Sequence, residues 1–295
     1  MKWKYMILVL LAGCCVGSLS TITKIGIANG YTVGELLAGQ FIIGWILLIV
    51  LGLCSKNKTA FKELTLLVVG GIAIGCVSIF YTLSVSMLPA SIAVLLLFQF
   101  TWIGIVIDSV AMKKWPEKRT VFSVVVILGG TFLASGMMES RVLQYDPLGV
   151  LLGLLAAVSF AVYIFVMGRT SAEVPAIQKS LFMMTTAGIL VLTVFSPFSL
   201  VQDGVSEEWL LYSLFLALLG NIFPVLFMSI GVPKIGSSMG TILSSSELPA
   251  AVLLSAVVLN ETIGRLQWIG VLMIFAAIVV SQWSPVRKKK IKKAA

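Results

Sequence analysis

The sequence predicts an all-α polytopic membrane protein with about ten transmembrane helices, arranged as two inverted five-helix repeats. Three observations predict this fold: the composition, the length of the apolar runs, and a similarity between the two halves. Of the 295 residues, 59% are hydrophobic and 11% are charged, whereas soluble domains are nearer half apolar and a quarter charged. The composition therefore indicates a chain that folds in lipid.

The apolar runs have the length that a bilayer requires. About 20 apolar residues cross the hydrocarbon core, and a helix satisfies its own backbone hydrogen bonds there. We predict spans at residues 5–27, 33–53, 64–86, 90–111, 119–138, 147–168, 178–199, 209–230, 236–258 and 266–284. Because the connections are short, they leave no room for a sizeable soluble domain.

The basic residues predict the orientation of these spans. With a cytoplasmic N-terminus and ten spans, all Lys and Arg except Lys24, Arg141 and Arg265 fall in cytoplasmic segments. Such a bias orients membrane helices, so we expect a multi-pass protein of the cell inner (plasma) membrane with both termini in the cytoplasm. The net charge of +9 then indicates contact with anionic membrane lipid and no nucleic-acid partner.

The N-terminal segment has a competing interpretation as a lipoprotein signal, since Leu11-Ala12-Gly13-Cys14 fits a lipobox. The apolar run continues to Ala28, which makes it long enough to span, so we expect a first helix. The four cysteines have neither metal-site nor disulfide spacing. We therefore expect no metal and no cofactor.

A shift of 147 residues superposes the two halves of the chain. The identical pairs that it brings together include Val85 with Val232, Ser91 with Ser238, Leu96 with Leu243, Val124 with Val271 and Ile127 with Ile274. Each half contains five spans, and an odd number inverts the second half, as in many transporters. We predict a first repeat at 1–138, an external linker at 139–146, a second repeat at 147–284 and a basic cytoplasmic tail at 285–295.

Three stretches resemble the drug/metabolite transporter superfamily, in its EamA-type branch of ten-helix transporters: GSLSTITKIGIA, SMLPASIAVLL and IGSSMGTILSSSELPAAVLLSAVVLNETIGRLQWIG. The resemblance covers nearly the whole chain. Glu247 and Pro249 stand where such proteins often carry an acid-proline element, and Glu261 stands at the position that precedes their last helix. Gln40 departs from the pattern, because the family often has an arginine in the second helix.

The resemblance implies a secondary transporter that exports or exchanges a small organic metabolite, amino-acid-like or drug-like, by alternating access. It names no substrate. Whether protons couple to transport stays open, as does the choice between a monomer and a homodimer.

Glu247 is the first candidate for substrate binding or coupling. It lies near the centre of its predicted span, where a charge costs about 2.5–3.5 kcal/mol, so such residues face the bundle interior or water. Residues three and four apart share a helix face, so Ser244 joins it on one polar stripe. Pro249 lacks an N–H and frees the Ser245 carbonyl. The alternative is a protonated or hydrogen-bonded acid that holds helices together.

Six further residues within or near spans are weaker candidates: Lys24, Gln99, Trp102, Asn221, Tyr81 and Gln40. Lys24 lies toward the outer end of its helix, where it either snorkels to the surface or faces an anionic group of the substrate. Each of the others has a plainer interpretation as an interhelical hydrogen bond or an interfacial aromatic. Asp108 is expected to form a local ion pair with Lys113.

An enzyme is not expected. The chain has no histidine, which removes the commonest general base, and it lacks a zinc-protease motif. A membrane scaffold or sensor that transports nothing remains the main alternative, and a membrane-embedded enzyme is a more remote one.

Overall fold

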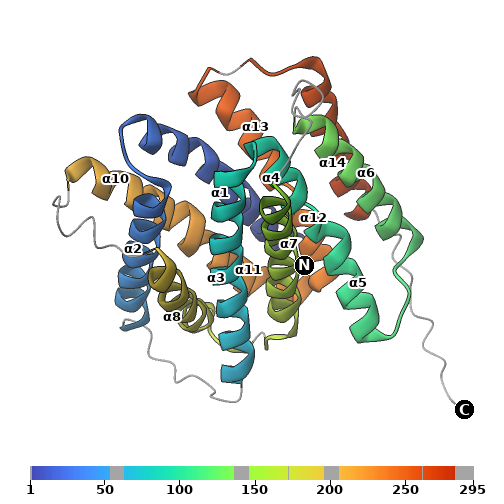
Figure 1. The fold of residues 1–295 in the computed structure, drawn as a ribbon. Helices are drawn as coiled ribbons and strands as arrows, with labels where there is room; N and C mark the ends of the chain where they lie inside the picture. Colours follow the sequence, from blue (N-terminus) through green and yellow to red (C-terminus); the bar gives the residue numbers. More distant parts are fainter. Residues whose placement is uncertain are drawn as a thin grey trace, which may run out of the picture.

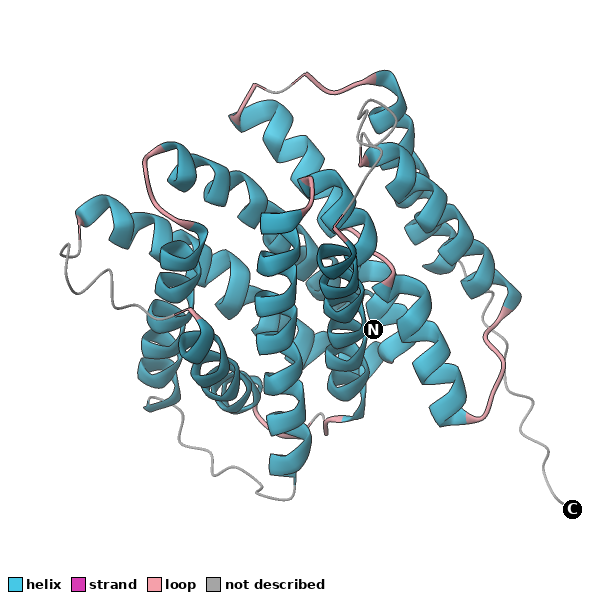
Figure 2. Ribbon diagram, viewed as in Figure 1, coloured by secondary structure: helices cyan, strands magenta, loops and turns pink. Residues whose placement is uncertain are grey.

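The computed structural model describes residues 2–53, 63–135, 146–171, 173–195, 206–260 and 262–282. Within these ranges every regular element is a helix (Figure 2). The first half contains α1 (Lys2–Ala28), α2 (Val33–Leu53), α3 (Leu64–Met87), α4 (Ala90–Leu97), α5 (Phe100–Met112) and α6 (Lys118–Ala134). The second half contains α7 (Pro147–Arg169), α8 (Ala176–Val194), α10 (Glu207–Leu216), the π-helix η3 (Ala217–Ile222), α11 (Phe223–Ile235), α12 (Ser237–Ser244), α13 (Glu247–Val258) and α14 (Arg265–Gln282).

Each of the ten predicted spans corresponds to one helix or to a run of consecutive helices. Eight segments of the described chain are long and apolar enough to cross a bilayer. The fifth and tenth spans are shorter, with 17 residues in α6 and 18 in α14. The all-α fold class is confirmed. Arg141, Cys54, Glu261 and the basic tail lie outside the described residues.

The helices pack with the same pattern in both halves. In the first half α3, the third span, packs on α7 and α8, the first two spans of the second half. The eighth span, which consists of α10, η3 and α11, packs on α1 and α2 of the first half. The fifth and tenth spans, α6 and α14, lie side by side at one edge (Figure 1). This reciprocal packing agrees with the two-repeat architecture.

The fourth and ninth spans are both interrupted, and at corresponding places. The interruption between α4 and α5 falls at Phe98 and Gln99, and that between α12 and α13 falls at Ser245 and Ser246. A shift of 147 residues superposes these two pairs. Their backbone angles agree closely: φ −65°, ψ −7° then φ −59°, ψ −16° in the first half, and φ −64°, ψ −7° then φ −63°, ψ −14° in the second.

Each interruption is a tightened turn of 3₁₀ type. The amide N–H of Gln99 donates to the Leu96 carbonyl, three residues earlier, and that of Ser246 donates to the Leu243 carbonyl. A 3₁₀ stretch within a long helix often marks a hinge or strain. Pro249 accounts for a break in the ninth span, because proline cannot continue the i to i−4 ladder. The fourth span has Trp102 at that position and breaks without a proline.

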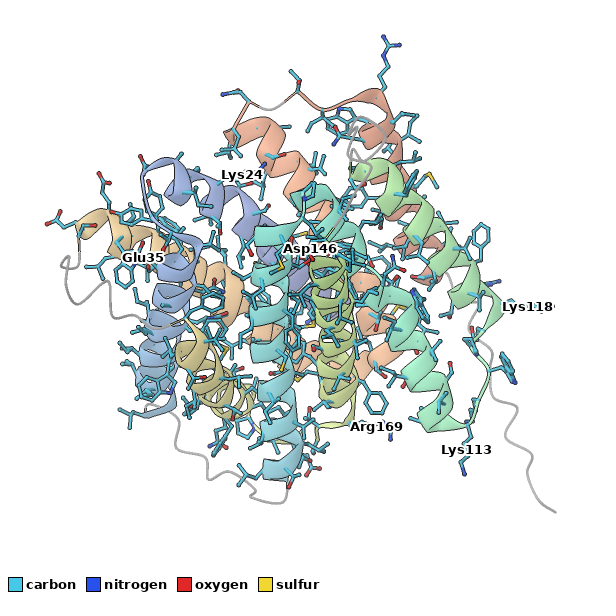
Figure 3. The ribbon with its side chains drawn as sticks, in the orientation of Figure 1. Lys24, Glu35, Lys113, Lys118, Asp146 and Arg169 are labelled. Atoms are coloured by element: carbon cyan, nitrogen blue, oxygen red, sulfur yellow. The ribbon has the colours of Figure 1, made fainter. Side chains whose placement is uncertain are left out.

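The charged ends of the helices separate along the bundle. Lys113 and Arg169 lie toward the lower end in Figure 3, whereas Lys24 lies toward the upper end. This separation agrees with an orientation in which the lower end is cytoplasmic. The orientation itself stays a prediction.

Candidate functional site

The α12–α13 break lies directly against α1. A Cβ atom on Gly13 would overlap Ser246 Oγ, and one on Gly17 would overlap the Glu247 carbonyl oxygen. Ser246 Oγ donates a hydrogen bond of 2.9 Å to the Leu10 carbonyl. The small residues of the first helix therefore allow α1 to approach the break closely, and they fix the position of the acid.

Glu247 is the first residue of α13 and its carboxylate is unpaired. Ser244, Ser245 and Ser246 are at most 1% exposed, yet Glu247 beside them keeps accessible surface. Among the described residues, no hydrogen-bond or ion-pair partner of Glu247 is found. The phenol of Tyr81, on α3, interacts with it electrostatically. An accessible, unpaired acid in the middle of a span is more consistent with ligand contact than with helix association.

A second acceptor without a donor lies two residues away. In the first half, the Phe98 carbonyl accepts from the Thr101 amide at 3.1 Å and from Thr101 Oγ1 at 2.9 Å. Its counterpart, the buried Ser245 carbonyl, receives no such bond within the described part of the chain. Pro249 has no N–H to offer it. Buried carbonyls are normally paired, so this site is short of donors.

The corresponding break in the first half has a different chemistry. Phe100 takes the place of Glu247 and is fully buried. Its ring lies 5.5 Å from that of Phe98 and 4.6 Å from that of Phe160, measured between centroids. The two halves therefore share a backbone turn, but only the second half bears an acid there.

Gln99 and Trp102 belong to this aromatic break and bond to each other. Trp102 Nε1 donates to Gln99 Oε1 at 2.9 Å, and Gln99 Nε2 donates to the Leu95 carbonyl at 3.0 Å. Trp102 is 43% exposed. The polar groups of both side chains are therefore hydrogen-bonded within the α4–α5 break.

Gln40 and Asn221 form a reciprocal pair between α2 and η3. Gln40 Nε2 donates to Asn221 Oδ1 at 2.9 Å, and Asn221 Nδ2 donates to the Gln40 carbonyl at 3.2 Å. Both residues are buried. Their contacts match the plainer interpretation given to them above, an interhelical hydrogen bond.

Replacement of Asn221 by alanine should therefore lower stability more than transport. It leaves the Gln40 amide unpaired in the bundle, and interhelical hydrogen bonds in membranes contribute about 0.6–1.7 kcal/mol. Thermal unfolding in detergent should show that the single variant Asn221→Ala is less stable than the double variant that carries both Gln40→Ala and Asn221→Ala. The double variant leaves no side-chain amide without a partner. Equal destabilisation of the two would contradict a mutual pair.

The remaining predicted candidates are less close to the acid. Lys24 is exposed near the upper end of α1 (Figure 3). Ser244 is buried, and its hydroxyl donates to the Gly240 carbonyl of its own helix at 2.8 Å. Of the predicted set, Tyr81, Ser244 and Pro249 share the neighbourhood of Glu247.

Sequence reasoning missed a buried cation, Lys179 on α8. It is 1% exposed, and its Nζ donates to Thr170 Oγ1 at 3.2 Å and to the Ser229 carbonyl at 3.3 Å. Pro233 frees that carbonyl, because it lies four residues further along α11 and has no N–H. The Glu63 carboxylate adds an attractive electrostatic interaction. The sequence signal was the proline inside an apolar span.

Asp108 has a different partner from the expected one. Its carboxylate accepts from Ser237 Oγ at 2.6 Å and from Ser238 Oγ, so no local pair with Lys113 forms. These bonds join α5 to the first turn of α12. The expectation was wrong because it considered only neighbours in sequence.

Comparisons with known proteins agree with this fold. The sequence profile of the EamA-like transporter family matches residues 3–136 and 147–282. A curated relative, the "Uncharacterized transporter YcbK" of Bacillus subtilis (strain 168), is 23% identical over 183 residues, which cover 60% of this chain and 59% of the relative. A solved crystal structure superposes with a TM-score of 0.78 at 19% identity, over 96% of this chain and 97% of the other. At that identity the superposition shows the fold alone.

Proposed function

We propose, since the chain belongs to the EamA-like transporter family, that it is a secondary transporter which exports or exchanges a small organic metabolite across the cytoplasmic membrane. The unpaired carboxylate of Glu247, at a break in the middle of a span, carries this proposal. An acid at that depth is expensive unless it meets a substrate, an ion or water. A family of transporters also argues against an enzyme.

The two repeats would be inverted, with the first at 1–138 and the second at 147–284. The linker at 139–146 would be external, and the tail at 285–295 would lie on the cytoplasmic side of the inner membrane. The reciprocal packing of the halves and the coincident breaks support this arrangement. In such folds the site lies near the midplane between the repeats.

The packing of the four half-helices supports alternating access. At one end α5 packs on α12, and Gly104 lies against Thr241. At the other end, α4 and α13 make at most a marginal contact over the described residues. In the proposed orientation the packed end is cytoplasmic, so this conformation is closed toward the cytoplasm. Asp108 would hold it closed through Ser237 and Ser238.

Removal of this bond should favour opening toward the cytoplasm. In a background without the four native cysteines, a Thr241→Cys reporter should react about tenfold faster with maleimide when Asp108 is replaced by alanine, because bonds to a charged group contribute about 1.5–3 kcal/mol. Lys113→Gln, at the same end of α5, serves as the control. An unchanged rate for Asp108→Ala would exclude Asp108 as a closing contact.

The transporter proposal is tested by an export panel. Cells that express the wild type or Glu247→Gln are given amino acids, their toxic analogues, nucleosides and cationic drugs, and mass spectrometry measures each compound inside and outside. We expect the wild type to lower one compound inside the cells and Glu247→Gln to lose that effect at equal membrane abundance. If neither protein moves any compound and Glu247→Gln alters only stability, the scaffold or sensor alternative replaces transport.

Proton coupling is the finer part of the proposal. Glu247 would exchange a proton during the cycle; Tyr81 and the Cys14 thiol are titratable groups that interact with residues of the break. In proteoliposomes, an imposed pH gradient should drive wild-type transport but not transport by Glu247→Gln. If the protein is a facilitator, the pH gradient should leave the transport rate of both proteins unchanged.

A further inference from the structure

The α12–α13 break presents acceptors and no cation. Glu247 has an unpaired carboxylate, and the Ser245 carbonyl two residues earlier has no donor within the described chain. No Lys or Arg of the described residues contributes to the electrostatic environment of Glu247. A group that supplies both hydrogen-bond donors and positive charge would therefore complement this break.

Four serine hydroxyls on α1 and at the break support this conclusion, because each donates its proton to a backbone carbonyl. On α1, Ser18 donates to Cys15 at 2.6 Å and Ser20 donates to Gly17 at 3.1 Å. At the break, the hydroxyls of Ser244 and Ser246 donate to Gly240 and Leu10. A serine hydroxyl has one proton and two lone pairs, so these serines can only accept from a ligand.

The chain itself shows how it satisfies a carbonyl freed by proline. In α11, Pro233 frees the Ser229 carbonyl, and the Lys179 ammonium occupies the place of the missing donor. The Thr170 hydroxyl accepts from this ammonium, the Glu63 carboxylate attracts it and the nearby Lys234 repels it. Pro249, the Ser245 carbonyl and Glu247 repeat three parts of that arrangement, but the chain supplies no ammonium there.

We infer that the substrate carries a primary or secondary ammonium group, and that this group docks at the α12–α13 break on the Glu247 carboxylate and the Ser245 carbonyl. The transport half of this inference rests on the proposed function. A single positive charge fits best, because the corresponding position in the first half is the buried Phe100. An anionic group of a substrate would face the Glu247 carboxylate and the Ser245 carbonyl, which disfavours it.

Cys14 offers a direct readout of occupancy. Its half-buried thiol, on α1, interacts with Ser246 at the break. In the full-length protein with Cys15, Cys54 and Cys76 replaced by serine, the alkylation rate of Cys14 by N-ethylmaleimide is measured with three probes of similar shape. The probes are phenethylammonium, 2-phenylethanol and 3-phenylpropanoate.

We expect phenethylammonium alone to slow alkylation. In Glu247→Gln its half-effective concentration should rise at least about tenfold, since a charged hydrogen bond is lost, while Gly188→Ala, which is remote from the break, should behave as wild type. Equal protection by the alcohol or the carboxylate overturns the inference. So does protection that survives in Glu247→Gln, or protection by none of the three probes.

A second variant tests the carbonyl separately. Pro249→Ala restores an amide N–H that can donate to the Ser245 carbonyl, so phenethylammonium should bind several-fold more weakly. Phenethyltrimethylammonium has no N–H, so its weaker protection should be the same in wild type and Pro249→Ala. Equal losses for both probes would mean that Pro249 acts only through the fold and would overturn the role of the carbonyl.

The two proposals fail in distinguishable ways. Export of a compound without an ammonium group, with no protection by phenethylammonium, would leave the transporter standing and overturn the substrate class. Protection by phenethylammonium without export of any amine would support the binding site and overturn transport.

Discussion

Replacement of Gly17 by alanine should lower the thermal unfolding temperature by roughly 2–9 °C and abolish most transport. The added Cβ would overlap the Glu247 carbonyl oxygen, and it would lie 2.9 Å from Ala250 Cβ and 3.0 Å from the Ala251 amide nitrogen. Two of these atoms are backbone, so no side-chain rotation relieves the overlap. α1 must move away from the break, and this movement removes the helix contact that holds Glu247 in position.

Gly188→Ala is the matched control for this variant. It too lies within a membrane helix, α8, but the nearest atom to its added Cβ is Phe41 Cδ1 at 4.0 Å. Alanine is the better helix former, so Gly188→Ala should be as stable as wild type or slightly more so. Both variants are measured by thermal unfolding in detergent and by transport of the compound found in the export panel. Similar results for the two glycines would contradict a close α1 contact at the break.

Replacement of Lys179 by alanine should cause the largest loss of stability, about 2–4 kcal/mol. The change leaves the Ser229 carbonyl without the ammonium donor, removes the bond that the Thr170 hydroxyl oxygen accepts, and creates a cavity where the side chain was fully buried. The loss should appear as a lower midpoint of thermal or denaturant unfolding.

A second substitution distinguishes the carbonyl from the cavity. Pro233→Ala restores an N–H opposite the Ser229 carbonyl, so it should recover part of the stability lost in Lys179→Ala. In the wild-type background the same change has no orphaned carbonyl to satisfy, and it should bring little gain. If Pro233→Ala has the same effect in both backgrounds, Lys179 does not serve that carbonyl.

Local patterns in the sequence predict the helices well, and they single out Glu247 as a candidate. Apolar runs of bilayer length predict the spans, because the hydrophobic requirement acts on each segment separately. Glu247 and Pro249 stand out within an apolar run for the same reason. The break at Phe98 and Gln99 has no such local signal, since no proline accompanies it, and only the comparison of the two halves in three dimensions reveals it.

Partners that lie far apart in sequence could not be predicted. Gln40 and Asn221 are 181 residues apart, and the separation between Asp108 and Ser237 is 129. Each pairing depends on how two helices cross, which composition and spacing do not report. Lys179 was placed by charge with the cytoplasmic lysines, whereas helix packing buries it against α11. The role of Glu247 stays a prediction until transport is measured.

The shared turn at Phe98 and at Ser245 has a consequence for how such a protein diverges. Both repeats keep one backbone geometry at this turn, and only the second bears an acid there; in the proposed function, bending would therefore belong to both repeats and substrate recognition to the second alone. The first repeat can bend at the corresponding turn, and its buried aromatic residues need not match the substrate. Changes of selectivity then need to alter only a few side chains of the second copy, and the bending points that both halves use remain as they are.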